Sequence, residues 1–223
     1  MFSSIYIEQI PFKNIIRVHE ASDLKYTNFI MISMVSITVV LLGIIMAAAV
    51  FIREKESGTL EQLMVTPIRS FELIIAKLLP MSIIKMIGLT IGVAMSFVFF
   101  NVPLRGSLLL FYLLSLLVFI SSSGLGILIA TVSNTMQQAL LLSFFVLFPL
   151  MFLSGTVVPV ENMSPFLQWL SYLSPLRYYT DISMGIFLKG VGVSVLWPDI
   201  AALVVLGGFL FVISTYRLKK QLY

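Results

Sequence analysis

The feature that most constrains this chain is a series of long apolar segments, each about the length needed to cross a membrane. Residues 29–52 contain no charged side chain, and a helix that rises about 1.5 Å per residue spans roughly 30 Å over this length. Further apolar segments cover residues 74–100, 108–132, 139–154 and 197–216. Backbone groups in lipid must satisfy one another, which favours helices. The sequence therefore predicts an all-α integral membrane protein with about five transmembrane helices.

The composition supports this class and excludes others. The chain is 59% hydrophobic and 11% charged, whereas soluble domains average about 25% charged residues. It has no cysteine, which excludes disulfides and thiolate metal sites. Its net charge of +4 comes from basic residues beside the apolar segments, as positive-inside topology predicts, so we expect no nucleic-acid binding. It has no P-loop motif, and we predict no enzyme activity, metal or cofactor in this chain.

A polar hinge, residues 53–70, lies between the first two apolar segments. Thr59 and Gln62 have the spacing of a capping box, and Glu61 stands where the helix dipole favours an acid. Pro67 ends the predicted helix, because the residue before a proline avoids the α region. The hinge is therefore predicted to contain a short, capped helix.

This short helix has an apolar face. Leu60, Leu63 and Met64 recur at i, i+3 and i+4, so they lie on one side of the helix. A capped helix with such a face could dock on a partner protein. A solvated turn that lies on the lipid headgroups would explain the same pattern, and the residues alone favour neither interpretation.

The hinge resembles the signature of ABC-2 type transporter permeases, of the drug-exporter subgroup with an external domain. The similarity covers residues 53–67 and the sequence Ala76-Lys77-Leu78-Leu79-Pro80, although the family usually has Gly in place of Ala76. In that family this loop carries a cytoplasmic coupling helix, which docks on a separate ATPase subunit. The resemblance thus implies a coupling site formed by Glu54, Gly58, Thr59, Leu60, Glu61, Gln62, Leu63, Thr66 and Pro67.

Residues 155–190 extend the resemblance, which covers about 200 residues of the chain. In this segment Ser164-Pro165 and Ser174-Pro175 each predict an N-cap followed by proline in the first helical turn. The family implies two short re-entrant helices here, in the outer leaflet, that close the exit of a translocation path. The residues of this predicted outer gate are Ser154, Gly155, Pro159, Glu161, Asn162, Pro175 and Arg177.

The apolar segments contain a few residues that could line a path for a solute. Lys85 is the only charge well inside a segment, and it could either extend to the interface or line a polar cavity. The serines at 121–123 could pack helices together or line the path, and Pro149 should kink or break its helix. An enzyme alternative is a serine hydrolase, with one of Ser121 to Ser123 or Ser154 as nucleophile and Lys85 as base. The candidate path residues are Lys85, Ser121, Ser122, Ser123 and Pro149.

The flanking charges give the expected topology. Basic residues close to the spans favour a cytoplasmic hinge and C-terminus. Five spans then place residues 1–28 outside, where Ile15, Ile16 and Val18 indicate short strand-like pieces. Family members usually have another span and an external domain before the five, so we expect a truncated or split member that lacks the first span.

The resemblance implies a permease subunit of an ATP-binding-cassette exporter in the plasma (inner) membrane. It would move a small amphipathic or drug-like solute outward and pair with a second permease chain. A separate ATPase subunit would hold ATP and Mg²⁺. Two alternatives stay open. The chain could be a non-transporting remnant or one half of a split gene, or it could be a secondary transporter or channel.

Overall fold

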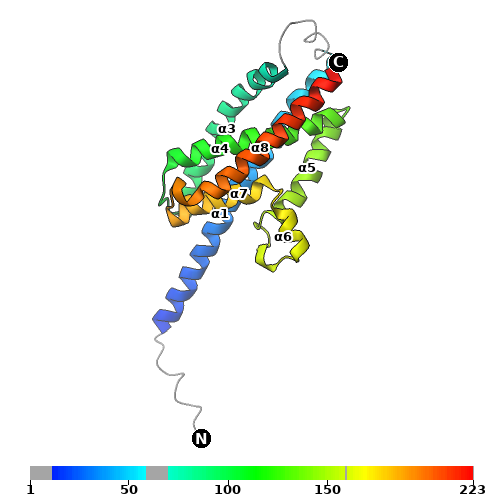
Figure 1. Ribbon diagram of the computed structural model, residues 1–223. Helices are drawn as coiled ribbons and strands as arrows, with labels where there is room; N and C mark the ends of the chain where they lie inside the picture. The colour runs from blue at the N-terminus through cyan, green and yellow to red at the C-terminus, as the bar shows by residue number, and fades with distance from the viewer. Residues whose placement is uncertain (1–11, 59–69, 159, 223) are drawn as a thin grey trace.

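In the computed structural model, residues 12–58, 70–158 and 160–222 are described, and all regular secondary structure in these ranges is helical. Within these ranges, five helices contain a stretch that is long and apolar enough to cross a membrane. They are α1 (Phe12–Glu56), α3 (Ser70–Phe100), α4 (Leu108–Val132), α5 (Met136–Leu153) and α8 (Val193–Leu222). This confirms the predicted all-α class with five candidate spans (Figure 1).

Short helices connect α5 to α8. They are the 3₁₀ turn η1 (Val160–Asn162), α6 (Pro165–Ser171), α7 (Pro175–Met184) and the π-helical turn η2 (Gly185–Lys189). Ser164 and Ser174 are the N-caps of α6 and α7, and each is followed by proline, as the sequence predicts. Neither serine side chain makes a capping hydrogen bond. The Ser174 hydroxyl instead donates to the Leu150 carbonyl oxygen at 3.3 Å, which ties α7 to α5.

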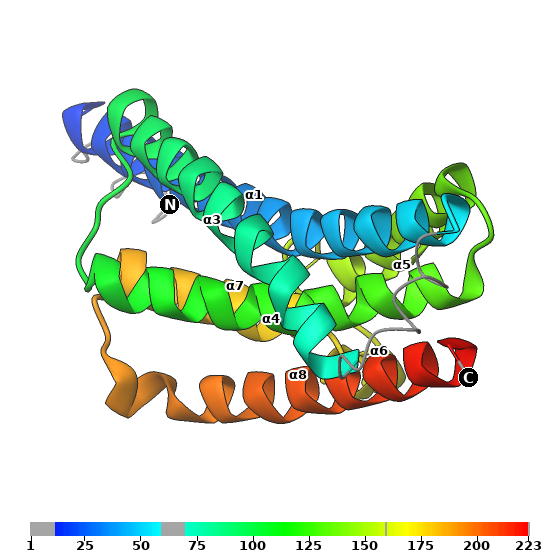
Figure 2. The ribbon, with the colours of Figure 1, turned by 90° about the horizontal axis from the view of Figure 1, so that it is seen from above.

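Helix α4 lies at the centre of the bundle, between α1 on one side and α8 on the other (Figure 2). Small residues make the close packing possible. A Cβ atom on Gly126 would lie 2.3 Å from the Ile44 carbonyl oxygen of α1, and one on Gly124 would lie 3.1 Å from the Leu210 carbonyl carbon of α8. The sequence of serines and glycines at 121–126 therefore lets α4 approach both neighbours closely.

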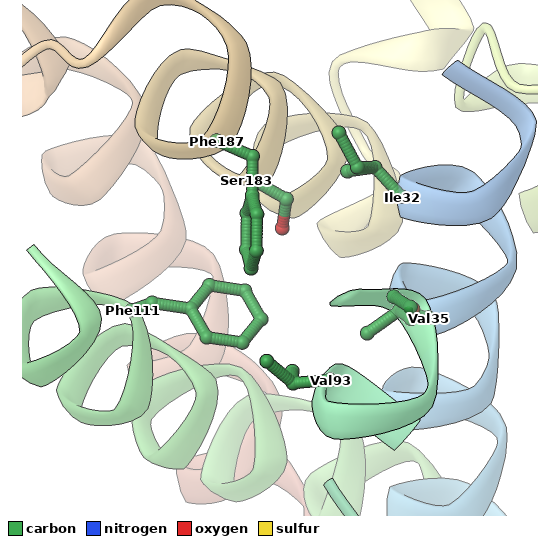
Figure 3. Close-up of a pocket in the computed structure, with 7 residues that line it drawn as sticks. Ile32, Val35, Val93, Phe111, Ser183 and Phe187 are labelled. Carbon is green, nitrogen blue, oxygen red and sulfur yellow. The ribbon is translucent and has the colours of Figure 1, made fainter. Parts of the chain in front are cut away.

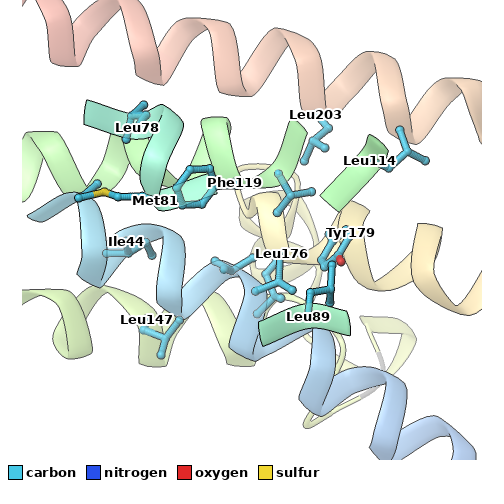
Figure 4. Packing of buried hydrophobic residues seen from close by; sticks show 14 of the residues in the cluster. Ile44, Leu78, Met81, Leu89, Leu114, Phe119, Leu147, Leu176, Tyr179 and Leu203 are labelled. Carbon is cyan, nitrogen blue, oxygen red and sulfur yellow. The ribbon is translucent and has the colours of Figure 1, made fainter. Parts of the chain in front are cut away.

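The buried core is formed where α1, α3, α4, α7 and α8 converge. Figure 4 shows Phe119 of α4, Leu176 of α7 and Leu203 of α8 directed toward this common interior. Tyr179 of α7 is fully buried, and its hydroxyl lies 2.7 Å from the Ser115 hydroxyl of α4. This hydrogen bond satisfies a polar group that would otherwise be costly to bury.

The outer faces of α3, α5 and α8 are apolar and exposed. Val98 of α3, Phe145 of α5 and Val205 of α8 expose 73%, 76% and 73% of their surface. Soluble proteins rarely expose such continuous apolar faces. These faces fit a lipid environment or contact with another membrane helix.

The five candidate spans run in alternating directions between two ends of the molecule (Figure 1). The hinge end holds the C-terminal ends of α1 and α8, the start of α3 and the α4–α5 turn. The far end holds the turn at 101–107 and the short helices α6 and α7. The C-terminal end of α8 thus lies at the same end as both flanks of the hinge.

One expectation is wrong, and one of the two alternatives given for Pro149 is excluded. The strand-like pieces expected at Ile15, Ile16 and Val18 are part of α1, which is continuous from Phe12. Extending an existing helix adds one hydrogen bond per residue without new nucleation, so a long span can continue into a mixed segment. Of the two effects expected of Pro149, a break does not occur, because α5 continues to Leu153, and a kink stays a prediction. Proline is tolerated in membrane helices when nearby groups satisfy the freed carbonyl.

Candidate functional site

The last turn of α1 is joined by side chains to three other parts of the hinge end. Glu54 of α1 and Lys77 of α3 form an ion pair, and their side chains are only 20% and 21% exposed. This pair connects the two helices that flank the hinge. In a region with restricted water access, such a pair holds its geometry more firmly than a pair on an open surface.

The next two residues bind the turn between α4 and α5. Lys55 donates from Nζ to the Ser133 carbonyl oxygen at 2.6 Å, at the C-terminal end of α4. Glu56 accepts through Oε1 from the Met136 backbone N–H at 2.7 Å, at the first residue of α5. Each charge has the sign that the adjacent helix terminus favours. These bonds also satisfy backbone groups that a helix leaves unpaired at its ends.

We name Glu54, Lys55, Glu56 and Lys77 the hinge clamp. Immediately after it, Gly58 has φ of +69°, a conformation that glycine adopts readily. The rest of the predicted coupling site lies outside the described residues, namely Thr59, Leu60, Glu61, Gln62, Leu63, Thr66 and Pro67. Any displacement applied to the hinge would therefore reach α1 and α3 directly, and α4 and α5 through the clamp.

Sequence reasoning missed the contacts with Ser133 and Met136. A signal was present, because Thr135 and Gln138 have the spacing of a helix start between two apolar segments. The Thr135 hydroxyl accepts from the Gln138 N–H at 3.2 Å, and Gln138 Oε1 accepts from the Asn134 N–H at 2.9 Å. A sharp turn of this kind leaves unpaired backbone carbonyl groups at the end of α4 and unpaired N–H groups at the start of α5. The sequence does not reveal which distant side chains bind them.

The predicted outer gate lies at the far end. The Ser154 hydroxyl donates to the Met151 carbonyl oxygen at 2.7 Å, and Gly155 follows with φ of +83°. Glu161 and Asn162 are exposed on η1, whereas Pro175 is buried at the start of α7. Pro159 lies outside the described residues.

Arg177 holds α6 against α7. Its guanidinium donates to the Ser171 hydroxyl and to the Gln168 carbonyl oxygen, the latter at 3.5 Å. It also lies 4.3 Å from the centre of the Tyr172 ring. Planar guanidinium groups combine such hydrogen bonds and ring contacts well. Arg177 thus acts as a structural tie within this segment.

The two short helices differ in burial. Phe166, Trp169 and Leu173, in and just after α6, are 70%, 67% and 59% exposed. In contrast, Tyr179 and Ile182 of α7 are fully buried in the core. Exposed aromatic side chains of this kind are typical of membrane interfaces. α7 therefore belongs to the bundle core, whereas α6 carries an apolar surface that faces outward.

The surroundings of Asp181, on α7 at the far end, shift the pKa of its carboxyl. Partial burial removes water from the carboxyl and raises the pKa of Asp181 from 3.8 to about 6. The negative charge of Asp199 raises this pKa further. Arg177 and Lys189 act in the opposite direction. The ionised form is thus disfavoured in the folded chain. Stability at this site increases as pH falls through about 6 toward the unfolded value near 4.

The candidate path residues are not brought together within one chain. Ser122 and Ser123 are buried and both donate to the Phe119 carbonyl oxygen, at 3.1 and 2.7 Å. Ser121 lies against α8, where a Cβ on Gly207 would be 2.8 Å from the serine hydroxyl. Pro149 is exposed on α5.

Among the described residues, two cavities with room for a ligand lie beside the candidate path residues. One, of about 560 Å³, is an apolar groove between α3, α4 and α8, lined by Leu79, Phe119, Ser121 and Gly207 among others. The other, of about 300 Å³, lies between α1 and α3 and is lined by Lys85. Lys85 is 2% exposed and has no hydrogen-bond partner in the described part of the chain, so no serine is positioned to use it as a base.

A third cavity, between Ile32, Val93, Phe111 and Phe187, is shown in Figure 3. Its volume is about 10 Å³, which is near the minimum for one water molecule. The Phe111 and Phe187 rings meet edge to face, with centroids 4.9 Å apart. This space is a small packing defect and not a site for a solute.

Comparison with known proteins decides the family. The family model described as ABC-2 type transporter matches residues 2–188. This chain belongs to the ABC-2 type transporter family. Together with its five candidate spans, this membership makes it a multi-pass membrane protein. The resemblance seen in the hinge and in residues 155–190 is thereby confirmed at the level of the family.

Several relatives are permeases of Escherichia coli K12. The "probable multidrug ABC transporter permease YbhR" is 34% identical over 82% of this chain and 50% of its own length. The "inner membrane transport permease YhhJ" is 32% identical with the same coverage, 82% and 50%. "ABC transporter G family member 20" of Dictyostelium discoideum is 27% identical over 85% of this chain and 26% of its own length. The chain spans about half the length of the bacterial relatives.

Proposed function

We propose that this chain is the membrane-spanning permease part of an ATP-binding-cassette exporter. It would move a small amphipathic or drug-like solute outward with energy from a separate ATPase subunit. That partner would hold ATP and Mg²⁺, and this chain would not itself act on ATP. The observation that carries the proposal is the hinge clamp, which joins the predicted coupling site to α1, α3 and the α4–α5 turn.

The proposed mechanism is a shift between two arrangements of the helices. If the ATPase docks more tightly on one arrangement of the hinge when ATP is bound, that arrangement becomes more populated. The ion pair of Glu54 with Lys77 would make α1 and α3 move together. The bonds of Lys55 and Glu56 would pass the same displacement to α4 and α5.

We infer that the hinge end is cytoplasmic. The C-terminal end of α8 lies at the same end as the hinge, so a single orientation in the membrane would place the hinge and the C-terminal end of α8 on the cytoplasmic side. Short basic segments beside membrane spans favour the cytoplasmic side. The basic residues in question are Arg53, Lys55, Arg69, Lys77, Arg217, Lys219 and Lys220.

In this proposal two permease chains pair, and α6 and α7 close the outer end of the path between them. The exposed aromatic residues of α6 support a position in the outer membrane interface. The apolar groove of about 560 Å³ between α3, α4 and α8 has the size and character of a site for an apolar solute.

The test replaces the apolar face of the predicted hinge helix. With Leu60, Leu63 and Met64 all changed to Ser, we expect capture of the ATPase in a pull-down from membranes to fall tenfold or more, because each substitution removes apolar contact area. Membrane insertion should be unchanged. The matched control is the change of Phe144, Phe145 and Phe148 on the exposed face of α5 to Leu. Undiminished capture by the hinge variant would contradict the proposal.

A further inference from the structure

Lys85 is a buried basic residue whose side-chain nitrogen has no hydrogen-bond partner among the described residues. The residue is 2% exposed. The nearest compensation is the Phe119 ring of α4, whose centre lies 4.3 Å from Nζ. An ammonium group has three N–H donors, and an aromatic face restores only part of the hydration that burial removes. The site therefore needs an acceptor, preferably a negatively charged one.

A cavity next to Lys85 has room for such a group. It measures about 300 Å³ and lies between α1 and α3, which is at the lower end of the range for small-molecule sites. Apart from Lys85, the polar side chains of its lining are those of Thr38 and Ser96. The remaining wall is apolar, with Met31 and Leu42 from α1 and Leu89 and Phe100 from α3 among its residues. One cation with apolar walls matches a ligand that has one charged group and an apolar body.

The cavity opens laterally. Met34 of α1 and Met95 of α3 belong to its lining and are 54% and 52% exposed, so they form its rim. Both helices are candidate membrane spans, so the opening lies at membrane depth. A ligand that reaches it comes from the lipid phase. A small hydrophilic anion could not take this route without losing its hydration.

We propose that the Lys85 cavity binds an amphiphile with a single anionic headgroup, a carboxylate or a phosphate, and an apolar chain. In the structure Lys85 Nζ lies against the Phe119 ring, so the side chain turns toward the cavity when the ligand binds. The headgroup oxygens then accept hydrogen bonds from Lys85 Nζ, and the chain lies between α1 and α3. A neutral amphiphile leaves Nζ without acceptors of comparable strength, and a cationic one is repelled. The order of affinity is therefore anionic, then neutral, then cationic. This binding does not depend on ATPase coupling, so it can hold even if the proposed function fails.

The experiment measures binding of dodecyl phosphate to the purified full chain in a neutral maltoside detergent, by native mass spectrometry and calorimetry. We expect one molecule per chain. Lys85→Met retains the volume of the side chain but removes the charge, and it should weaken binding about tenfold or more. Dodecanol and dodecyltrimethylammonium should bind more weakly to the unaltered chain, in that order.

A second variant removes the cavity and keeps the charge. A Cβ on Gly92 meets no atom within 4 Å, so Gly92→Leu fills the space without a clash and also favours the helix. Binding should be lost although the variant folds. Gly192→Leu is the matched control, since its Cβ is equally unobstructed and it lines neither of the two larger cavities. Lys189→Met removes an exposed cation, and both controls should bind like the unaltered chain.

Two sources could supply the ligand, a membrane phospholipid or a free single-chain acid. Solvent extraction of the purified protein followed by mass analysis distinguishes them, and in either case the anionic species should be depleted in Lys85→Met. Equal binding of dodecyl phosphate to the unaltered chain and Lys85→Met would overturn the proposal. Equal affinity for dodecanol and dodecyl phosphate would overturn it as well, as would unchanged binding in Gly92→Leu.

Discussion

Replacing Gly126 with Leu should prevent the bundle from assembling. A Cβ at this position would lie 2.3 Å from the Ile44 carbonyl oxygen, 2.8 Å from the Ala47 Cβ and 3.0 Å from the Ala48 backbone nitrogen. Two of these three atoms belong to the backbone of α1, so no side-chain rotation relieves the contact. Even Gly126→Ala must separate α1 from α4, and we expect a cost of about 3 kcal/mol, at the upper end for an overpacked core.

The measurement is the yield of monodisperse protein in size-exclusion chromatography, with thermal unfolding of whatever is recovered. Gly126→Leu should give no monodisperse peak, and Gly126→Ala should unfold roughly 10 °C lower than the unaltered chain. Gly208→Leu on α8 is the control, because its Cβ meets nothing within 4 Å. Normal yield and thermal stability of Gly126→Leu would show that α1 and α4 do not pack as described.

Reversing one charge of the hinge clamp should have the second largest effect. Glu54→Lys places two cations where the structure has an ion pair with Lys77, at side chains only 20% and 21% exposed. Loss of the attraction and the new repulsion together should cost about 3 kcal/mol, as for other ion pairs with little water access. α1 and α3 would then separate at the flanks of the hinge.

The exchange of both charges isolates this contact from other effects. Glu54→Lys combined with Lys77→Glu restores an attractive pair, so it should recover most of the thermal stability that either single variant loses. If the proposed ATPase subunit and solute are supplied in a reconstituted complex, stimulation of ATP hydrolysis by the solute should be lost in each single variant and return in the double variant. If the double variant is no better than the singles, the pair does not link the two helices.

The fold class could be predicted from the sequence because membrane spans are coded by length and composition alone. The uncharged stretch at 29–52 lies within α1, and the interval between the apolar segments 108–132 and 139–154 contains the turn between α4 and α5. The N-caps Ser164 and Ser174 were predictable because the proline after each one restricts the backbone locally. Local chemistry of this kind does not depend on distant partners.

The contacts across the bundle could not be predicted. The bonds of Lys55 to Ser133 and of Glu56 to Met136 join residues 78 and 80 positions apart. Only the packing of α1 against α4 and α5 brings them together. The sequence could not decide whether the Lys85 side chain extends to the membrane interface or lines a cavity. The rotation of α3 about its axis decides between these two positions. That rotation depends on which α3 residues meet α1 and Phe119.

Labelling from outside intact cells tests the central proposal most directly, namely that the hinge faces the cytoplasm, the side on which the proposed ATPase would dock. The chain has no cysteine, so Glu61→Cys introduces a single thiol. A membrane-impermeant maleimide should label it only after the cells are permeabilised. Glu161→Cys, exposed on η1 at the far end, should be labelled in intact cells. Labelling of Glu61→Cys in intact cells, with Glu161→Cys protected, would contradict the account.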